Sequence, residues 1–320
     1  MKTRLAIRTG SRLHLGPLAV GAPSGRRFGG VGLMIDQPGY HLRAESAPEW
    51  SYEGPADVAQ RLQQFADRFR QHIPDVPSLR LTVLHAGPSH AGLGSGTQIG
   101  LAVARLLSQF ARKTEFSVDE LAHSVGRGQR SALGVHGFVH GGFLVEGGKL
   151  TDAEVGALAA RLEFPDDWRI ILVQPPRTVG LSGAAEQQAF ESLAPMPHGL
   201  TTELCRIVLM ELLPALTRKH FEEFAHAVGH FSRLVGDYFA PQQGGWFADR
   251  RMEALALDLE SRGWLGVAQS SWGPTIAIFC PSAAAAEQLI GDVLSRPPWA
   301  DCQTRIVSGL NHGAELIIAD

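Results

Sequence analysis

The sequence predicts an α+β fold in two units, and three observations lead to this prediction. A chain of 320 residues with 44% apolar content is long enough to bury the cores of about two domains. Strand-like and helix-like apolar patterns alternate in the first half, whereas long helical patterns dominate much of the second half. Between them, Glu163 to Asp167 combines a proline with acidic residues just before a strong strand pattern. We therefore divide the chain into residues 1–165 and 166–320.

The first unit is expected to alternate strands with helices. Asp57 to Ile73 carries apolar residues at helical spacing, so one face of this helix should pack on a sheet. Ser117 and Glu120 have the spacing of a capping box that opens a further helix. Two glycines divide Gly141 to Leu150 into apolar halves, which predicts a hairpin. The other elements expected here are a strand at Thr3–Thr9, loops and turns over Gly10–Gly32, a strand at Leu79–Leu84 and a helix at Thr97–Arg112.

The second unit is expected to begin with the apolar strand Trp168 to Gln174. Long helical patterns follow it, and shorter strand patterns come after them. The expected elements are helices at Leu200–Leu213, Arg218–Val235, Phe247–Arg262 and Ala283–Leu294, and strands at Gly266–Ala268, Thr275–Cys280 and Ala314–Ala319.

Composition excludes several classes of function. Charged residues make up 19% of the chain and the net charge is -3, so no polycationic surface is available for nucleic-acid binding. Cys205, Cys280 and Cys302 are far apart and show no CxxC spacing, which argues against a disulfide framework or a structural zinc site. The N-terminal residues lack a signal-peptide pattern, and no run reaches the roughly 18 apolar residues of a membrane helix. We predict a cytoplasmic protein with no nucleic-acid or membrane partner.

The segment from Pro88 to Gln98 is the first with chemical content, because it joins a predicted strand to a predicted helix. Its three glycines leave room for a ligand close to the backbone, and the helix start presents free N–H groups. Ser95 and Thr97 add hydroxyls that suit phosphate oxygens or magnesium. The simpler alternative is a tight turn with a helix cap. Three glycines and two hydroxyls at this junction favour a phosphate or diphosphate site, although the pattern is neither a Walker A loop nor a dinucleotide fingerprint.

This segment resembles the central motif of the GHMP kinase superfamily. A second segment, Gly266 to Thr275, is similar to the third glycine-rich motif of that superfamily. The resemblance implies an N-terminal βαβ domain that contains the phosphate loop, a C-terminal ferredoxin-like domain and a ligand cleft between them. It also suggests a homodimer.

Several motifs together resemble one branch of the superfamily, the β-ribofuranosylaminobenzene 5′-phosphate synthases. The branch joins phosphoribosyl diphosphate to 4-aminobenzoate, or to a close relative such as 4-hydroxybenzoate, and loses carbon dioxide and diphosphate on the way to tetrahydromethanopterin. Gln98 and the Gln269–Trp272 lead into Gly273 are the most specific features. The motifs that carry the resemblance are Ser11–Gly16, Arg27–Gly32, Gly92–Gln98, Arg130–Gly134, Gly236–Ala240, Gln243–Gly245 and Gln269–Thr275.

Two alternatives to this synthase stay open. Several kinase branches carry an aspartate in the stretch that here reads Arg130 to Gly137, where it orients or deprotonates an attacking hydroxyl. No carboxylate is present in this stretch, which weakens the hypothesis of an ATP-dependent small-molecule kinase without excluding it. ATP is expected as a cofactor only in that alternative. A catalytically silent relative that binds a ligand is the third hypothesis.

The resemblance and the loop together define the predicted phosphate and diphosphate site. Its residues come from the two glycine-rich motifs, and they are Gly92, Leu93, Gly94, Ser95, Gly96, Thr97, Gln98, Ser270, Ser271 and Gly273.

The remaining predicted residues serve the chemistry, the aromatic substrate or the metal. Phe28 and Trp272 are expected to form a slot for the aromatic ring, although Trp272 also suits a core position. Magnesium is expected with Glu186 as the first candidate ligand and Asp36 as the second. The catalytic candidates are Arg12, Arg26, Arg27, His90 and Ser95. Arg26 and Arg27 also suit an ordinary surface loop, and His90 also suits a role in bracing the turn.

Overall fold

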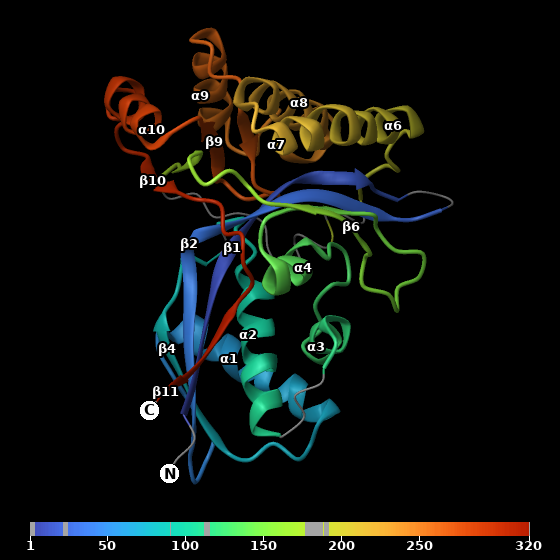
Figure 1. Cartoon of the computed structure of the whole chain (residues 1–320), viewed down its shortest axis with the longest axis vertical. Coiled ribbons are helices and arrows are strands. Elements are labelled where there is room, and N and C mark those ends of the chain that lie inside the picture. The colour runs from blue at the N-terminus through green and yellow to red at the C-terminus, as the bar shows by residue number, and fades with distance from the viewer. Residues whose placement is uncertain are drawn as a thin grey trace.

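The computed structural model describes residues 4–21, 25–89, 91–111, 116–176, 188 and 192–319. Two β-sheets and two groups of helices make up this part of the chain (Figure 1). No helix in these described ranges is both long and apolar enough to cross a membrane.

The first sheet is built on two long antiparallel strands, β1 (Arg4–Ala19) and β2 (Phe28–Ser46). Its main path has the order β11-β1-β2-β4-β3, and β5 and β6 extend it beside β2. The other strands of this sheet are β3 (Ser51–Glu53), β4 (Leu79–His85), β5 (Phe143–Glu146), β6 (Leu158–Leu162) and β11 (Glu315–Ala319).

Two sequence predictions in this region were wrong. Gly10–Gly32 was expected to be loop and turn, but β1 continues to Ala19 and β2 begins at Phe28. The two strands pair along most of their length, and register shifts near Gly10 and Gly16 accommodate the glycines within the pairing. The hairpin expected within Gly141–Leu150 does not form, because β5 pairs with β2 and with the more distant β6.

One face of the first sheet is covered by α1 (Ala56–His72) and α2 (Ser95–Phe110), which pack on each other beside the long strands (Figure 1). Both helices were predicted from their apolar periodicity, and both predictions are confirmed. Gly100 lets α2 approach α1 closely, because a Cβ at this position would lie 3.2 Å from the Phe65 ring. Two shorter helices complete this layer, α3 (Val118–Ser124) and α4 (Leu133–His140), and the predicted capping box of Ser117 and Glu120 opens α3.

The second sheet has the order β10-β7-β9-β8, with β7 (Arg169–Gln174), β8 (Val267–Gln269), β9 (Ile276–Cys280) and β10 (Gln303–Val307). Alternate residues of β7 enter different cores, so both faces of this sheet are buried. The sequence predicted β7, β8 and β9 but did not predict β10. The helices of this half are α6 (His198–Ile207), the π-helical turn η1 (Val208–Leu212), α7 (Leu213–Arg218), α8 (Phe221–Gln243), α9 (Arg250–Ser261), α10 (Ala283–Leu289) and the π-helical turn η2 (Ile290–Leu294).

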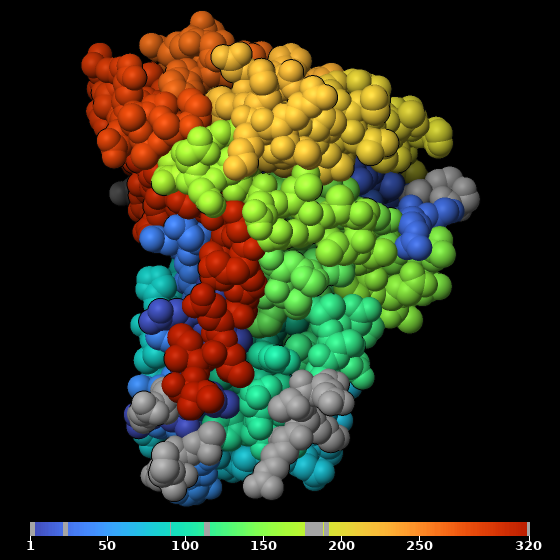
Figure 2. Space-filling view, in the orientation of Figure 1, coloured from blue at the N-terminus to red at the C-terminus, as the bar shows by residue number. Residues whose placement is uncertain are grey.

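The second half of the chain contributes a strand to the first sheet, and the two halves share an apolar core. The strand expected at Ala314–Ala319 forms as β11, but it pairs with β1 of the first sheet and not with the second sheet. Figure 2 shows this C-terminal segment crossing the surface from the second half onto the first. One apolar core joins β1 and β2 to α8, where Val235 and Phe231 pack against Gly16. The domain boundary at residue 165 stays a prediction, and β11 crosses it.

Candidate active site

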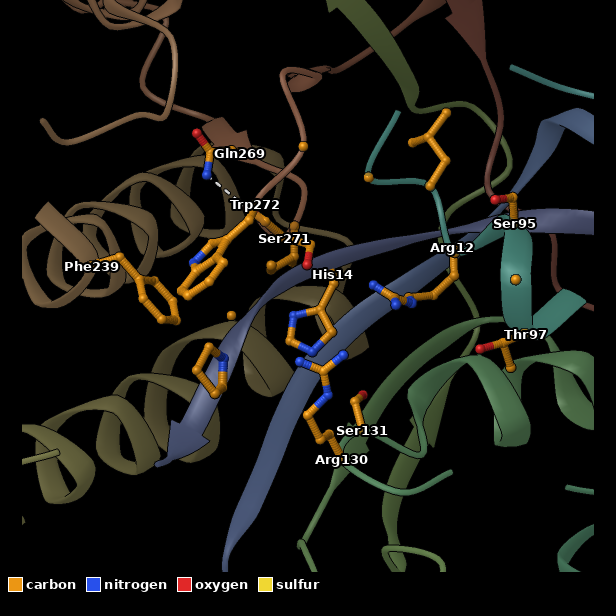
Figure 3. Close-up of a pocket in the computed structure, with 18 of the residues that line it drawn as sticks. Arg12, His14, Ser95, Thr97, Arg130, Ser131, Phe239, Gln269, Ser271 and Trp272 are labelled. Carbon is orange, nitrogen blue, oxygen red and sulfur yellow. Dashed lines mark hydrogen bonds between the residues drawn. The ribbon is translucent and has the colours of Figure 1, made fainter. Parts of the chain in front are cut away.

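A cavity of about 580 Å³ opens where the two halves of the chain meet (Figure 3). Segments that are far apart in sequence line it: the middle of β1, the first half of α1, the glycine loop before α2, the turn before α4, the second half of α8 and the loop after β8. The long strand β1 is central to this arrangement, because it runs from the first sheet to the helices of the second half.

The two glycine-rich motifs lie directly against each other. Gly92 and Gly273 make backbone contact, since a Cβ at residue 273 would lie 2.5 Å from the Gly92 Cα. Two hydroxyls tie the motifs together: Ser270 Oγ donates to the Gly92 carbonyl at 2.8 Å, and Thr275 Oγ1 donates to the Ala91 carbonyl at 2.7 Å. The second motif therefore fixes the position of the loop at the start of α2.

The loop ends in a helix start that suits an anion. Gly94 has φ +72° and occupies the N-cap position of α2, where no side chain of the described residues caps the helix. The Arg12 backbone N–H donates to the Leu93 carbonyl at 3.0 Å, which anchors the loop to β1. The N–H groups of the first turn and the positive end of the helix dipole are the features by which helix starts bind phosphate.

The cavity wall is strongly positive. Four arginines line it, namely Arg12, Arg61, Arg127 and Arg130, whereas Asp57 is the single carboxylate among the described lining residues. Ser89 donates a hydrogen bond of 2.7 Å to Asp57, and this bond is the main cause that lowers the pKa of the carboxyl. Such a carboxylate is a weak base, so the cavity is better suited to binding anions than to removing protons.

His14 lies between Arg12 and Arg130 inside the cavity (Figure 3). Burial, followed by the charges of the two guanidiniums, holds the pKa of His14 well below its ordinary value. The imidazole is therefore neutral at physiological pH. Its Nδ1 is buried, and no described residue hydrogen-bonds to it.

Aromatic side chains form the wall beside His14. Trp272 and Phe239 meet edge to face, with ring centroids 5.1 Å apart (Figure 3). Trp246 lines the same end of the cavity. These rings create an apolar surface next to a strongly cationic one.

A buried carboxyl lies behind this site. Glu146 is fully buried at the end of β5, where it accepts a hydrogen bond from the Ala132 backbone N–H just before α4. Burial is the largest cause that raises the pKa of Glu146 to about 7, while the hydrogen bonds and the charges of Arg12 and Lys149 act in the opposite direction. Its Oε1 has no hydrogen-bond partner among the described residues.

The structure brings most of the predicted phosphate-site residues together. The predicted residues that line the cavity are Arg12, Gly92, Leu93, Gly94, Ser95, Gly96, Thr97, Ser271, Trp272 and Gly273. His90 and Glu186 lie outside the described residues.

Three predicted residues near the start of β2 do not line the cavity. Arg26 is exposed and donates to the Gly148 carbonyl at 3.0 Å, while Arg27 forms an ion pair with Asp152 at 3.0 Å. Phe28 lies under the Lys149 ammonium, with 5.6 Å between the nitrogen and the ring centroid. Pairing of this segment with the region around Lys149 turns it away from the glycine loop.

Three further predicted residues have structural contacts and do not line the cavity. Gln98 is fully buried. Its side-chain oxygen accepts a hydrogen bond from the Thr9 hydroxyl and its side-chain nitrogen donates one to the Gly134 carbonyl, so Gln98 joins α2 to β1 and α4. Ser270 is also buried and braces the loop. Asp36 accepts a hydrogen bond of 2.9 Å from the Ser308 backbone.

Five residues that line the cavity were not among the predicted site residues, and they are His14, Arg61, Arg127, Arg130 and Phe239. His14 follows Arg12 by two positions, so both side chains leave the same face of β1. His14 lies within the motif Ser11–Gly16 and Arg130 begins the motif Arg130–Gly134, so both positions carried a usable signal. Arg61 and Arg127 lie in segments without a motif, and only the fold brings them to the glycine loop.

Magnesium fits the cavity only in part. In the described part of the chain, no three His, Cys, Asp or Glu side chains cluster as a metal site. Asp57 and the Thr97 hydroxyl are oxygen donors at the cavity wall, whereas the Ser95 hydroxyl accepts a hydrogen bond of 3.2 Å from Arg61. These donors suit a magnesium ion held mainly by substrate phosphates better than one held in a protein cage.

Comparison with known proteins agrees with the fold and the loop. The N-terminal domain model of the GHMP kinases matches residues 58–144. Mevalonate diphosphate decarboxylase from Staphylococcus aureus aligns over 99% of this chain and 98% of its own, with a TM-score of 0.68 and 13% identity. Homoserine kinase from Cytophaga hutchinsonii aligns over 99% and 97%, with a TM-score of 0.63 and 15% identity. The fold is thus that of the GHMP kinases, and residues 58–144, which include the glycine loop, match their N-terminal domain.

Sequence relatives narrow this class. The β-ribofuranosylphenol 5′-phosphate synthase of Methanothermobacter thermautotrophicus is 31% identical in an alignment that covers 86% of this chain and 88% of the relative. The synthase of the same name from Archaeoglobus fulgidus is 29% identical in an alignment that covers 98% of this chain and 99% of the relative. The chain belongs to the β-ribofuranosylphenol 5′-phosphate synthase family and is an enzyme of that type.

Proposed function

We propose that the cavity transfers ribose 5-phosphate from phosphoribosyl diphosphate to 4-hydroxybenzoate or 4-aminobenzoate, with release of carbon dioxide and diphosphate, in tetrahydromethanopterin biosynthesis. One observation carries the proposal: one cavity is lined both by four arginines with a helix start and by an aromatic wall. A polyanionic sugar and an aromatic acid together match both sides.

The names of the relatives favour one of the two acids. They specify a ribofuranosylphenol 5′-phosphate, and a phenol is the product expected when 4-hydroxybenzoate is the acceptor. We therefore propose 4-hydroxybenzoate as the first acceptor to test and 4-aminobenzoate as the second.

The bond changes require little covalent chemistry from the protein. The bond between the anomeric carbon and diphosphate breaks, and the ring carbon that carries the carboxylate forms the new bond to the anomeric carbon. The bond to the carboxyl carbon then breaks, carbon dioxide leaves, and its electron pair restores the aromatic ring. Positive charge grows on the sugar and negative charge on the departing diphosphate, so fixed cations and N–H groups lower the barrier.

The residues of the cavity meet these needs. The arginines and the first turn of α2 stabilise the departing diphosphate. Trp272 and Phe239 bind the flat acceptor and exclude water, which would otherwise hydrolyse the sugar. Magnesium, when carried by the diphosphate, supplies further neutralisation of its charge.

The kinase alternative receives less support from this cavity. Transfer to an alcohol benefits from a base near the hydroxyl. Among the described residues the lining carboxylate is Asp57, whose lowered pKa makes it a poor base. Cytoplasmic location and a homodimer stay predictions from the sequence and the resemblance.

The test uses the purified protein with magnesium in three parallel incubations. Phosphoribosyl diphosphate with 4-hydroxybenzoate or 4-aminobenzoate should release carbon dioxide and yield a C-riboside. ATP consumption with a small alcohol, without decarboxylation, would support the kinase. Tight binding of nucleotide or phosphoribosyl diphosphate without any turnover would support a silent ligand-binding protein.

A further inference from the structure

Two arginines from separate elements converge over the first turn of α2. Arg61 extends from α1, and Arg127 extends from the loop between α3 and α4. A Cβ built on Gly96 would lie 3.2 Å from Nη2 of Arg127 and 3.3 Å from Nη2 of Arg61. Arg127 is supported from behind by the Phe65 ring, with 4.9 Å between Cζ and the ring centroid.

The surroundings of this pair favour an anion. Nη1 of Arg61 is buried, and no described residue accepts a hydrogen bond from it. No ion pair within 4.0 Å joins Arg61 to a described carboxylate. Burial is the largest cause that lowers the pKa of Arg61, and the charge of Asp57 acts in the opposite direction. Two guanidiniums that approach one point repel each other, and a bound anion removes this repulsion.

A second cationic group lies on the other side of the loop. Arg12 packs against Gly94, where a Cβ would lie 3.3 Å from its Nε. Arg12 and Arg130 flank the neutral His14, next to the aromatic wall of Trp272 (Figure 3). Ser95, whose hydroxyl accepts a hydrogen bond from Arg61, lies on the side of Arg12 that faces away from Trp272 (Figure 3). The pair of Arg61 and Arg127 at the helix start is therefore farther from the aromatic wall than Arg130 and His14.

We infer that the cavity contains two separate phosphate subsites: Arg61 and Arg127 with the first turn of α2 bind a diphosphate group, and Arg130 with His14 binds a sugar phosphate. This inference rests on the proposed function. In a displacement at the anomeric carbon, the aromatic acceptor and the leaving diphosphate occupy opposite sides of that carbon. The acceptor lies at the aromatic wall, so the diphosphate belongs to the group farther away, and the 5′-phosphate takes the group near His14.

Binding of two fragments separates the subsites without any need for turnover. Isothermal titration of the full chain with inorganic diphosphate and with ribose 5-phosphate, both with magnesium, gives one dissociation constant for each subsite. Arg61→Gln and Arg127→Gln should each weaken diphosphate binding about tenfold or more, because each removes a charge-assisted hydrogen bond. The same variants should change ribose 5-phosphate binding less than about twofold. Arg130→Gln should show the opposite pattern.

Arg70→Gln is the matched control. Arg70 lies on α1 nine positions after Arg61, which places it on the opposite face of the helix. It forms an exposed ion pair with Asp67 outside the cavity, so its replacement should change neither constant. Thermal unfolding of each variant shows whether a lost affinity comes from a lost fold, and Arg127→Gln preserves the test where Arg61→Gln unfolds.

Several outcomes would overturn the inference. It is wrong where the Arg61 and Arg127 variants weaken both fragments equally, where Arg130→Gln weakens diphosphate instead, or where the wild type shows no saturable binding of diphosphate. A non-hydrolysable ATP analogue that competes with diphosphate gives a further test. If Arg61→Gln weakens binding of this analogue more than binding of phosphoribosyl diphosphate, the Arg61 and Arg127 subsite binds a nucleotide. If the dissociation constants change as expected but no carbon dioxide is released, the two subsites are supported and only the proposed reaction is contradicted.

Discussion

Gly92 and Gly273 lie back to back, so that residue 273 has no room for a side chain beside the Gly92 backbone. This contact joins the glycine loop of the first half to the loop after β8 of the second half. Both loops line the cavity, so their contact sets the distance between the helix start and the aromatic wall.

Gly273→Ala tests this joint. The new methyl group would meet backbone atoms of Ala91 and Gly92 at 2.5–2.7 Å, and backbone cannot move aside as a flexible side chain can. We expect a loss of about 1–3 kcal/mol in the free energy of unfolding and a larger loss in kcat/KM than this destabilisation explains. Denaturant unfolding and steady-state kinetics measure the two effects. Gly291→Ala is the control, because its Cβ position meets no atom within 4 Å outside its chain neighbours and its own helix backbone. It should leave kcat/KM unchanged and, because Gly291 lies in η2, raise the free energy of unfolding by at most about 1 kcal/mol.

Gly96→Ala tests the space in front of Arg61 and Arg127. The methyl group would lie within contact of both guanidiniums and displace them, while alanine improves helix propensity by about 1 kcal/mol. We expect weaker binding of diphosphate with an unchanged or higher melting temperature. A variant that binds diphosphate as the wild type does would show that the two guanidiniums adjust without loss.

Trp272→Leu tests the aromatic wall. An aromatic pair contributes about 0.5–1.5 kcal/mol, so the KM for the aromatic acid should rise about three- to tenfold. The dissociation constant for phosphoribosyl diphosphate should stay within about twofold. Trp264→Leu, which removes a tryptophan that does not line this cavity, should leave both values unchanged. A higher constant for phosphoribosyl diphosphate alone would place the sugar, and not the acceptor, at Trp272.

The raised pKa of Glu146 predicts a pH dependence of stability. The pKa is about 7 in the folded chain, above the ordinary value of 4.5, so the folded state binds the proton more tightly than the unfolded chain. The stabilising contribution is complete below pH 4.5 and is lost as the pH rises through 7. The side chain of the Glu146→Gln variant does not bind or release a proton in this pH range. The free energy of unfolding of the wild type, relative to the variant, should therefore fall between these pH values, by at most about 1.4 kcal/mol per pH unit. Parallel curves for the two proteins would contradict this assignment.

Local sequence patterns predicted the parts of the fold that depend on neighbouring residues. The amphipathic spacing in α1 and the loop that leads into α2 were recognised because their signals lie within one segment. The first part of β1 was predicted as a strand, but its glycine-rich continuation and the start of β2 were not, because the pairing of these two segments overrides the turn preference of glycine. β11 was found as a strand, but no local pattern indicates that its partner is β1, at the other end of the chain.

For the site, too, only the features with a local signal could be predicted from the sequence. The glycine loop was predicted, because its spacing has a direct physical meaning for phosphate binding. Arg26 and Arg27 were predicted to be catalytic because a planar guanidinium can bind two oxygens of an anion, yet a backbone carbonyl and an ion pair hold them outside the cavity. Arg61 and Arg127 reach the loop only through the packing of α1 and of the α3–α4 connection, which is information that one sequence does not contain.

The stoichiometry of the reaction tests whether the enzyme couples ribosyl transfer to loss of the carboxylate. The enzyme is incubated with phosphoribosyl diphosphate, magnesium and 4-hydroxybenzoate that carries an isotopic label in its carboxyl group, and labelled carbon dioxide and diphosphate are counted in the same sample. Decarboxylating ribosyl transfer should yield equal amounts of both, with neither formed when the aromatic acid is left out. Diphosphate release that continues without the acid, or phosphate transfer from ATP with the label retained in the acid, would contradict it.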